Sequence, residues 1–305
     1  MDVCVIGCGP SGVSASIYLK MAGYDVEVFE GNIIGGQMNT TPEVRNLAGA
    51  GSISGWELSK KMSQQLKEHD IRVMAEEVID VDLKNTPKKI VTPKGVYEAD
   101  AVVIANGVIR RELGCENEER FKGKGVSYCA VCDGFLYKGK VVAVIGGGNS
   151  ALEDTLYLSS ICKKVYLIHR REEFRGDRVM LDRIRSTSNV EIITPATVEK
   201  ITGDERVEAI SINVNGINQY KKTDGVFVAV GLKPCNEMFS RYISLDERGY
   251  ILADEMCRTD CNGVYAVGDT RRKHLRQIVT AMSDGAVASD DIIRNLSKKH
   301  QTNLD

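Results

Sequence analysis

Residues 3–12 read Val-Cys-Val-Ile-Gly-Cys-Gly-Pro-Ser-Gly, a continuous apolar run that enters a glycine-rich turn. A segment of helical character, residues 13–22, follows this turn, and a second apolar run covers residues 25–30. This order predicts a strand, a helix and a second, parallel strand, which together form a βαβ unit. Because polar residues do not alternate with the apolar ones, we expect strands that are buried on both faces of a parallel sheet.

The glycine spacing in this turn is typical of a dinucleotide-binding site. Gly7 permits the tight turn, Gly9 lets a pyrophosphate approach the backbone, and Gly12 lets the helix pack closely on the strand. The helix start then offers free N–H groups to the anion. Glu30 ends the second strand 18 residues after Gly12, where a carboxylate accepts hydrogen bonds from a ribose. A turn that binds nothing is the alternative for the glycines alone, but the strand, helix and acid together favour a nucleotide.

Residues 141–151, Val-Val-Ala-Val-Ile-Gly-Gly-Gly-Asn-Ser-Ala, repeat the same design further along the chain. A helix through about residue 159 and an apolar run at residues 164–168 follow, which predicts a second βαβ unit. The candidate contacts of this second turn with a dinucleotide are Gly146, Gly148, Asn149, Ser150 and Ala151.

The last strand of the second unit is followed by basic residues where the first unit has an acid. His169, Arg170 and Arg171 come directly after it, and Arg175 lies four positions further on. Positive charge here suits the 2′-phosphate of NADPH, because arginine holds phosphate through two parallel hydrogen bonds. A solvated basic run is the alternative, but its place at the strand end favours NADPH. For His169 a structural or stacking role is favoured over catalysis.

Residues 129–133, Cys-Ala-Val-Cys-Asp, precede the second unit. Two cysteines with two residues between them can close a small disulfide ring, and a helix start beside them stabilises a thiolate for exchange. A zinc site is the alternative, but zinc normally needs four ligands, and the other close pair, Cys257 and Cys261, falls in the other predicted domain. We therefore expect a redox dithiol and no metal. The catalytic candidates are Cys129, Cys132 and, for proton transfer during exchange, Asp133.

Two nucleotide sites and one dithiol in a single chain constrain the chemistry. A nicotinamide releases two electrons as a hydride, whereas a disulfide accepts them and becomes two thiolates. A flavin can take the electrons in the first form and deliver them in the second. The sequence therefore predicts a route from NADPH through FAD to the dithiol, and from there to a small protein disulfide.

The composition is that of a globular protein with two domains. The chain has 305 residues, of which 43% are hydrophobic and 27% charged. Its net charge of −2 favours neither nucleic acid nor an anionic membrane as a partner, and no apolar run approaches the roughly 20 residues of a membrane span. The nine cysteines do not resemble a secreted disulfide framework, and the first strand leaves no room for a signal peptide. We therefore expect a cytoplasmic protein.

The predicted fold class is α/β, with two Rossmann-like nucleotide-binding domains, the second inserted into the first. Further apolar runs predict strands at residues 101–107, 225–231 and 263–269 and a helix at about residues 277–295. The simplest layout places one domain at residues 1–112 and 241–305. The inserted domain, residues 113–240, carries the two cysteines of the dithiol.

The motifs, in this order and spacing, resemble the low-molecular-weight bacterial-type thioredoxin reductases over essentially the whole chain. The residues that carry the resemblance lie at 7–12, 35–37, 129–133, 146–151, 169–175, 268–269 and 276–277. The resemblance implies an FAD domain split around an NADPH domain, a homodimer, and thioredoxin or a similar small dithiol protein as the partner. It implies FAD contacts from Gly7, Gly9, Pro10, Ser11, Gly12, Glu30, Gly36, Gln37, Asn46, Gly107, Gly268, Asp269, Arg276 and Gln277.

The resemblance also gives each cysteine of the dithiol a role. It implies that Cys132 faces the flavin and that Cys129 attacks the partner disulfide, while the NADPH domain rotates between two poses. Three places depart from the family pattern: Cys8 replaces glycine, Asn106 replaces threonine, and Leu-Ala-Gly at residues 47–49 replaces an aromatic-Pro-Gly run. These departures concern the surroundings of the flavin rather than the reaction.

Several alternative functions stay open from the sequence. A glutaredoxin-like protein can take the place of thioredoxin, and a ferredoxin-dependent reductase shares both FAD and the dithiol. A flavin dithiol oxidase and a nucleotide-binding redox sensor use the same parts. The retained Arg170 and Arg171 argue against the ferredoxin-dependent and oxidase alternatives, and steady turnover distinguishes a reductase from a sensor.

Overall fold

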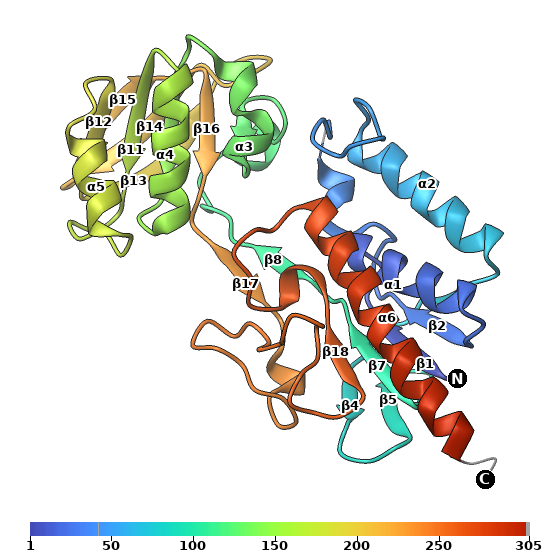
Figure 1. Cartoon of the computed structure of the whole chain (residues 1–305). Coiled ribbons are helices and arrows are strands. Elements are labelled where there is room, and N and C mark those ends of the chain that lie inside the picture. Colours follow the sequence, from blue (N-terminus) through green and yellow to red (C-terminus); the bar gives the residue numbers. More distant parts are fainter. Residues whose placement is uncertain (42, 303–305) are drawn as a thin grey trace. The chain divides into compact units, whose positions relative to one another are not determined.

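The computed structural model describes residues 1–41 and 43–302, and the chain divides into two compact units (Figure 1). Unit 1 comprises Met1–Ile109 and Lys233–Asp305, and unit 2 comprises Arg110–Leu232.

Unit 1 is built on a five-stranded parallel sheet. Its strands, in the order β18-β7-β1-β2-β3, are β18 (Val264–Ala266), β7 (Ala101–Ile104), β1 (Val3–Ile6), β2 (Val26–Phe29) and β3 (Arg72–Met74). Every neighbouring pair is parallel, and Val3 of β1 lies opposite Val26 of β2. Helix α1 (Pro10–Met21) joins β1 to β2, so the first predicted βαβ unit is confirmed.

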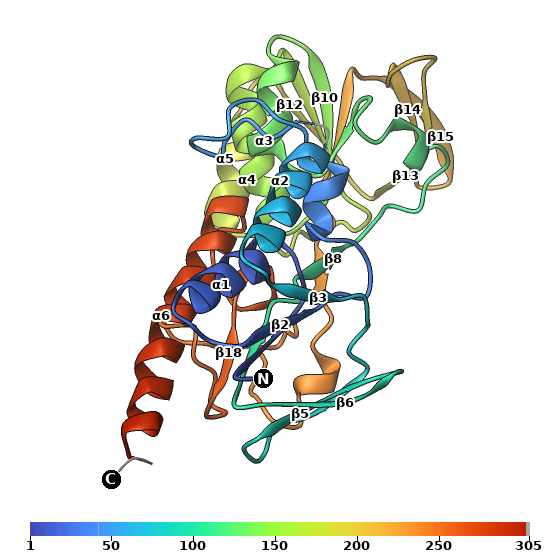
Figure 2. The ribbon, with the colours of Figure 1, turned by 90° about the vertical axis from the view of Figure 1, so that its right-hand side faces the viewer.

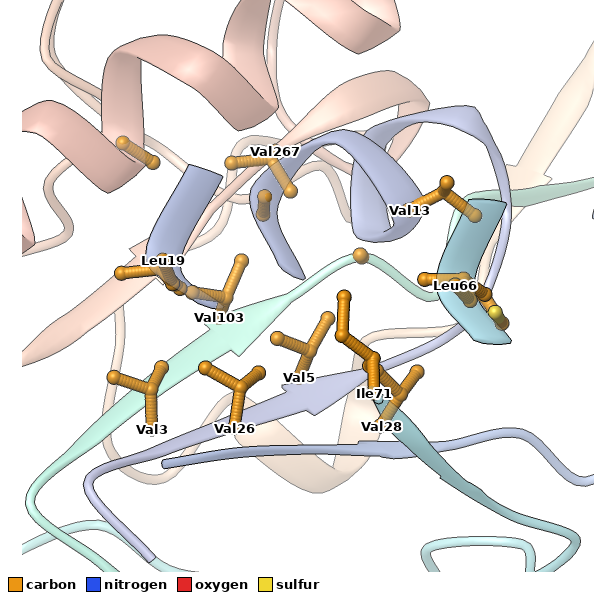
Figure 3. Close-up of a cluster of buried hydrophobic side chains, with 14 of the residues drawn as sticks. Val3, Val5, Val13, Leu19, Val26, Val28, Leu66, Ile71, Val103 and Val267 are labelled. Atoms are coloured by element: carbon orange, nitrogen blue, oxygen red, sulfur yellow. The ribbon is translucent and has the colours of Figure 1, made fainter. Parts of the chain in front are cut away.

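Both faces of this sheet are buried, because successive strand residues point to opposite sides. On one face Val3 and Val5 pack against α1, α2 (Gly55–Glu68) and α6 (Ile278–Thr302), as Figure 3 shows around Leu19 and Leu66. On the other face Cys4 and Ile6 belong to a second core cluster. Residues of that cluster also come from a three-stranded antiparallel sheet, formed by β4 (Asp80–Asp82), β5 (Lys88–Thr92) and β6 (Gly95–Ala99). Strands β5 and β6 of this sheet are labelled in Figure 2.

Unit 2 repeats this plan with a second five-stranded parallel sheet. Its strands, in the order β12-β11-β10-β16-β9, are β12 (Val190–Ile193), β11 (Lys164–Ile168), β10 (Val141–Ile145), β16 (Gly225–Val228) and β9 (Val126–Ser127). Helix α4 (Asn149–Ile161) joins β10 to its parallel neighbour β11. The remaining elements include α3 (Ala130–Asp133), α5 (Arg178–Arg185) and the antiparallel strands β13 (Ala196–Thr202), β14 (Ala209–Val214) and β15 (Ile217–Lys222). The predicted fold class is therefore confirmed.

The unit boundaries fall at residues 109/110 and 232/233, earlier than the predicted 112/113 and 240/241. The second difference has a clear physical cause. Phe239 in the short helix η4 (Glu237–Phe239) is fully buried in the core of unit 1, where Ile243 and Ile251 belong to the same cluster. The segment that follows β17 (Leu232–Pro234) therefore belongs to unit 1, although its polar residues resemble a linker.

Helix α6 runs to Thr302 and is thus longer than the predicted helix at residues 277–295. Its apolar face continues beyond the predicted end, because Leu296 is buried in the same cluster as Ile292. None of the helices in the described part of the chain combines the length and the apolar character that a bilayer span requires.

Candidate active site

Cys129 and Cys132 form a disulfide, with their Cα atoms 5.3 Å apart. Helix α3 begins directly after Cys129, and the N–H of Cys132 points at the Cys129 sulfur over 3.2 Å. An N–H donor aimed at a sulfur stabilises the thiolate that forms when the disulfide opens. The spacing of the two cysteines thus predicted the disulfide, and the structure places it at a helix start.

Asp133 is connected to the disulfide through Ser127. The Ser127 hydroxyl donates to Oδ2 of Asp133 over 2.6 Å and accepts from the N–H of Cys129 over 3.1 Å. Ser127 is buried in β9, and a role for it was not predicted from the sequence. A polar residue that ends an apolar strand two positions before a cysteine is the signal that could have found it.

The residue before Cys129, Tyr128, is also held by a buried acid, Glu118, which no sequence pattern had indicated. The Tyr128 hydroxyl donates to Oε1 of Glu118 over 2.8 Å, and the same carboxylate accepts from the N–H groups of Leu113 and Gly114. Burial and the adjacent Glu118 raise the pKa of Tyr128, so this hydroxyl stays protonated and keeps donating. The contact fixes the backbone that leads into the disulfide.

Apolar side chains are exposed around the disulfide. Val131, Phe135 and Leu136 have exposed fractions of 65%, 67% and 47%, and all three lie within seven residues of Cys129. An apolar group of this kind beside a reactive centre is typical of a surface that contacts another protein.

The three glycines of the first turn differ in how closely other atoms approach them. A Cβ added to Gly7 would lie 2.5 Å from the carbonyl oxygen of Ala105, and one on Gly12 would lie 2.0 Å from the carbonyl oxygen of Gly7. A Cβ on Gly9 would meet no atom within 4 Å. Gly7 and Gly12 are therefore required by packing, whereas Gly9 faces open space where a ligand can approach.

Glu30 lies beside this turn at the end of β2. Its Oε2 atom accepts from the N–H of Cys8 over 2.8 Å, and its Oε1 atom accepts from the N–H of Asn32 over 2.9 Å. Helix α1 begins at Pro10 without a side-chain cap, so its first N–H groups remain available to an anion. Burial and Glu30 raise the pKa of the Cys8 thiol to about 12, which leaves this departure from the family pattern without thiolate chemistry.

Two further predicted residues approach the same turn. A Cβ on Gly36 would lie 3.7 Å from the Cα atom of Gly9, and one on Gly268 would lie 2.5 Å from the Ser11 hydroxyl. Asp269 follows Gly268 in the short helix η5 (Gly268–Thr270). Residues distant in sequence thus converge on the start of α1.

The remaining predicted contacts of unit 1 have partners of their own. Asn46 donates to Oε1 of Gln277 over 2.9 Å, Gln37 donates to the carbonyl oxygen of Val108, and the Arg276 guanidinium lies 4.2 Å from the ring centroid of Tyr250. Gly107 has a φ of +65°, a backbone conformation that favours glycine. In the described part of the chain none of these residues forms a hydrogen bond with the first glycine turn, so their role toward a cofactor stays a prediction.

Asn106, which precedes Gly107, links the segment that follows β7 to the segment that follows β17. Its amide nitrogen donates to the carbonyl oxygen of Cys235 over 2.9 Å and to Oδ1 of Asn236 over 3.2 Å. This second departure from the family pattern therefore has a structural use within unit 1.

The second glycine turn shows the same separation of packing and open space. A Cβ on Gly146 would lie 2.3 Å from the carbonyl oxygen of Ala229 and 2.8 Å from Cβ of Ala151. A Cβ on Gly148 would meet no atom within 4 Å, and α4 begins after it without a side-chain cap. Asn149, in the first turn of α4, accepts from the N–H of Asp177, while the neighbouring Ser150 is exposed.

The arginine-bearing loop folds against this second turn. The N–H of Arg175 donates to the carbonyl oxygen of Gly147 over 2.8 Å. Arg170, Arg171 and Arg175 are exposed, and within the described residues none of their side chains forms a hydrogen bond or an ion pair. The loop that follows β11 is thereby held at the open glycine turn through the backbone of Arg175, and it carries three exposed cationic side chains, which suits a phosphate.

His169 is a packing residue rather than a member of that cationic group. Its ring is buried, and a Cβ on Gly147 would lie 2.4 Å from it, so Gly147 must be glycine for the ring to fit. The ring centroid of Phe174 lies 5.0 Å away. Burial, with a smaller effect of the neighbouring arginines, lowers the pKa of His169 and keeps the ring neutral.

Two Rossmann-like units in one chain, one of which carries a disulfide at a helix start, define a dinucleotide-dependent disulfide oxidoreductase. Residues 1–285 match the family described as pyridine nucleotide-disulphide oxidoreductase, and the chain belongs to this family.

Relatives that align over nearly the full chain support the same class. A thioredoxin reductase of Listeria innocua is 40% identical over 293 residues, 95% of this chain and 92% of the relative. That of Bacillus subtilis is 36% identical over 304 residues, 99% and 96% of the two chains. The crystal structure of thioredoxin reductase from Streptococcus pyogenes has a TM-score of 0.93 and 36% identity, covering 97% and 98%. These matches confirm the resemblance that the motifs predicted.

Proposed function

We propose that the chain is an NADPH-dependent thioredoxin reductase that uses FAD and ends on the disulfide of thioredoxin. The observation that carries the proposal is the Cys129–Cys132 disulfide in unit 2. The same unit holds the second glycine turn of the chain and the loop with the three exposed arginines. The relatives named thioredoxin reductase, at 36–40% identity, support the same reaction.

Unit 1 is the FAD domain in this proposal. The open space at Gly9, the uncapped start of α1 and the carboxylate of Glu30 suit an ADP-ribose with its pyrophosphate. FAD, when bound, accepts a hydride from a nicotinamide and passes its two electrons to a disulfide. We assign the FAD contacts to the residues predicted from the sequence in this unit.

Unit 2 is the NADPH domain. The open cradle at Gly148 suits the pyrophosphate, and Arg170, Arg171 and Arg175 suit the 2′-phosphate. Because the backbone of Arg175 is bonded to Gly147, the arginines and the cradle form one site within this unit.

Disulfide exchange is the step that the residues of unit 2 carry out. The Cys129 thiolate attacks a sulfur of the partner disulfide, which forms a mixed disulfide and releases one partner thiolate. The Cys132 thiolate then attacks Cys129, restores the Cys129–Cys132 bond and releases the second partner thiolate. Asp133 accepts the proton of each cysteine thiol in turn and passes it to the partner thiolate that is released in the same step, so the partner departs as a dithiol.

Thioredoxin, or another small dithiol protein, is the partner. The exposed Val131, Phe135 and Leu136 suit a protein surface better than a small polar disulfide. A homodimer and a cytoplasmic location, which the family resemblance and the cysteine usage imply, are parts of the proposal.

Steady-state turnover tests the proposal. Purified protein is expected to be yellow, and NADPH with catalytic protein is expected to reduce a large excess of thioredoxin. Matched assays with NADH, reduced ferredoxin, a glutaredoxin-like protein and oxygen separate the alternatives. Turnover with ferredoxin but not NADPH, or a single stoichiometric reduction without turnover, would contradict it.

A further inference from the structure

A buried charged cluster joins helix α6 to the turn that follows β18. Oδ2 of Asp284 accepts from the N–H of Gly268 over 2.9 Å, from Nε of Arg271 over 3.0 Å and from Nζ of Lys273 over 2.7 Å. The side chains of Asp284 and Lys273 are only 10% and 9% exposed. One carboxylate therefore ties the backbone of the turn to the helix.

The Gly268–Asp269 turn needs such a restraint. Gly268 has a φ of +76°, and glycine has more backbone freedom than any other residue, so the turn is not fixed by its own sequence. Helix α6 also meets α1 closely, because a Cβ on Gly285 would lie 2.4 Å from the carbonyl oxygen of Ser11, and Ser11 is the residue whose hydroxyl lies against Gly268. The start of α1, the turn and the region of Asp284 are thus packed together.

We propose that Asp284 is a positioning residue that fixes the Gly268–Asp269 turn for FAD, an inference that rests on the proposed function. A hydrogen bond from Gly268 to a carboxylate is charge-assisted and therefore stronger than one to a neutral oxygen. Arg271 and Lys273 orient the carboxylate through the hydrogen bonds that they donate to it. The turn that this carboxylate holds lies against Ser11 at the start of α1, where a pyrophosphate anion is favoured.

An ordinary buried ion pair is the alternative, and the same helix offers a matched control. Asp291 lies two turns further along α6, has a side chain that is 3% exposed, and pairs with Arg258. It also accepts from the Tyr265 hydroxyl over 2.8 Å. Asp291 thus matches Asp284 in charge and burial but does not contact the Gly268–Asp269 turn.

The test titrates flavin-depleted, full-length protein with FAD and follows flavin fluorescence and visible circular dichroism. We expect Asp284→Ala to raise the FAD dissociation constant at least tenfold. Asp284→Asn should raise it about threefold, because the amide oxygen can still accept from Gly268 but carries no charge. Asp291→Ala should lower the melting temperature and leave the FAD dissociation constant within twofold of wild type.

The outcomes distinguish a failure of the proposed FAD-dependent function from a failure of the role assigned to Asp284. Wild-type protein that binds no FAD would refute the proposed function and this inference together. Wild-type protein that binds FAD while folded Asp284→Ala binds it equally well would refute the inference alone, as would an equal loss in Asp291→Ala. Should Asp284→Ala not fold, an Asp284→Asn variant with unchanged affinity and an unchanged visible spectrum overturns it.

Discussion

Ser127 donates a hydrogen bond from Oγ to Oδ2 of Asp133 over 2.6 Å, and it accepts one from the N–H of Cys129 over 3.1 Å. A hydroxyl has one proton to donate, so this arrangement holds Asp133 as an acceptor. The position of the carboxylate relative to the disulfide segment is thereby fixed. In the proposed mechanism Ser127 thus connects the proton-transfer residue Asp133 to the disulfide segment and carries out neither step itself.

Replacing Asp133 by Asn should slow thioredoxin reduction by about 100-fold or more, the effect expected for loss of a general acid or base. NADPH should still bleach the flavin at the wild-type rate, because that step does not use Asp133. Stopped-flow absorbance and steady-state turnover measure the two steps. Asp182→Asn, at an exposed aspartate of α5, is the control. Wild-type turnover in Asp133→Asn would remove its assigned role.

Replacing Cys132 by Ser should abolish thioredoxin reduction and leave flavin reduction by NADPH intact, because no disulfide can re-form within the chain. The assay compares flavin absorbance with thioredoxin turnover. Cys115→Ser, at a half-buried free cysteine, should behave as wild type. Sustained turnover in the Cys132 variant would show that the electrons leave by another path.

Replacing Arg170 and Arg171 together by Ala should raise the KM for NADPH at least tenfold and leave the KM for NADH within about twofold. A charge-assisted hydrogen bond contributes about 1.5–3 kcal/mol, and only NADPH offers the 2′-phosphate that forms one here. Initial rates of flavin reduction with both nucleotides measure the preference. Arg183→Ala with Arg185→Ala, in the basic last turn of α5, is the control. Equal effects on both nucleotides would contradict the 2′-phosphate assignment.

Two adjacent glycines of the second turn should respond differently to alanine. Gly148→Ala adds a methyl group in open space, so the melting temperature should stay near wild type while the KM for NADPH rises severalfold. Gly147→Ala places a methyl group 2.4 Å from the His169 ring and should cost about 1–3 kcal/mol of unfolding free energy. Thermal unfolding and initial rates measure both effects. Reversed results would mean that Gly148, not Gly147, is the packing position.

The contribution of Asp291 to stability should depend on pH. Arg258 and the Tyr265 hydroxyl lower the pKa of Asp291, with the arginine the larger effect. A carboxyl with a lowered pKa stabilises the folded state above its unfolded pKa of about 3.9 and loses that effect as pH falls through the folded value. Asp291→Ala should therefore lower the free energy of unfolding at pH 7, with a difference from wild type that shrinks below about pH 4. Urea unfolding at both pH values measures it, and a constant difference would contradict the linkage.

Local patterns predicted most of the fold. Gly7 and Gly146 lie in turns whose strand, helix and second strand follow directly in the sequence, so each βαβ unit is encoded within about 30 residues. The cysteine spacing predicted the disulfide for the same reason. The second unit boundary was predicted at 240/241 and lies at 232/233. The pattern around Phe239 did not show this, because the burial of Phe239 depends on a core formed by distant strands.

Buried polar contacts that belong to no sequence motif could not be predicted in this way. Glu118 reaches Tyr128, and Asp284 reaches Gly268, only after the chain has folded. A signal existed for Asp284, which lies among the apolar residues that α6 turns toward the core. Neither composition nor spacing identifies the partner of such a charge, because many cations are available in the sequence.

The central claim is that electrons from NADPH end on the sulfurs of Cys129 and Cys132. The most direct measurement blocks the seven free cysteines with N-ethylmaleimide, adds one equivalent of NADPH without oxygen, and then alkylates with iodoacetamide for peptide mass spectrometry. We expect both Cys129 and Cys132 to carry the iodoacetamide label only when NADPH was added. A bleached flavin with the Cys129–Cys132 disulfide still intact would contradict it.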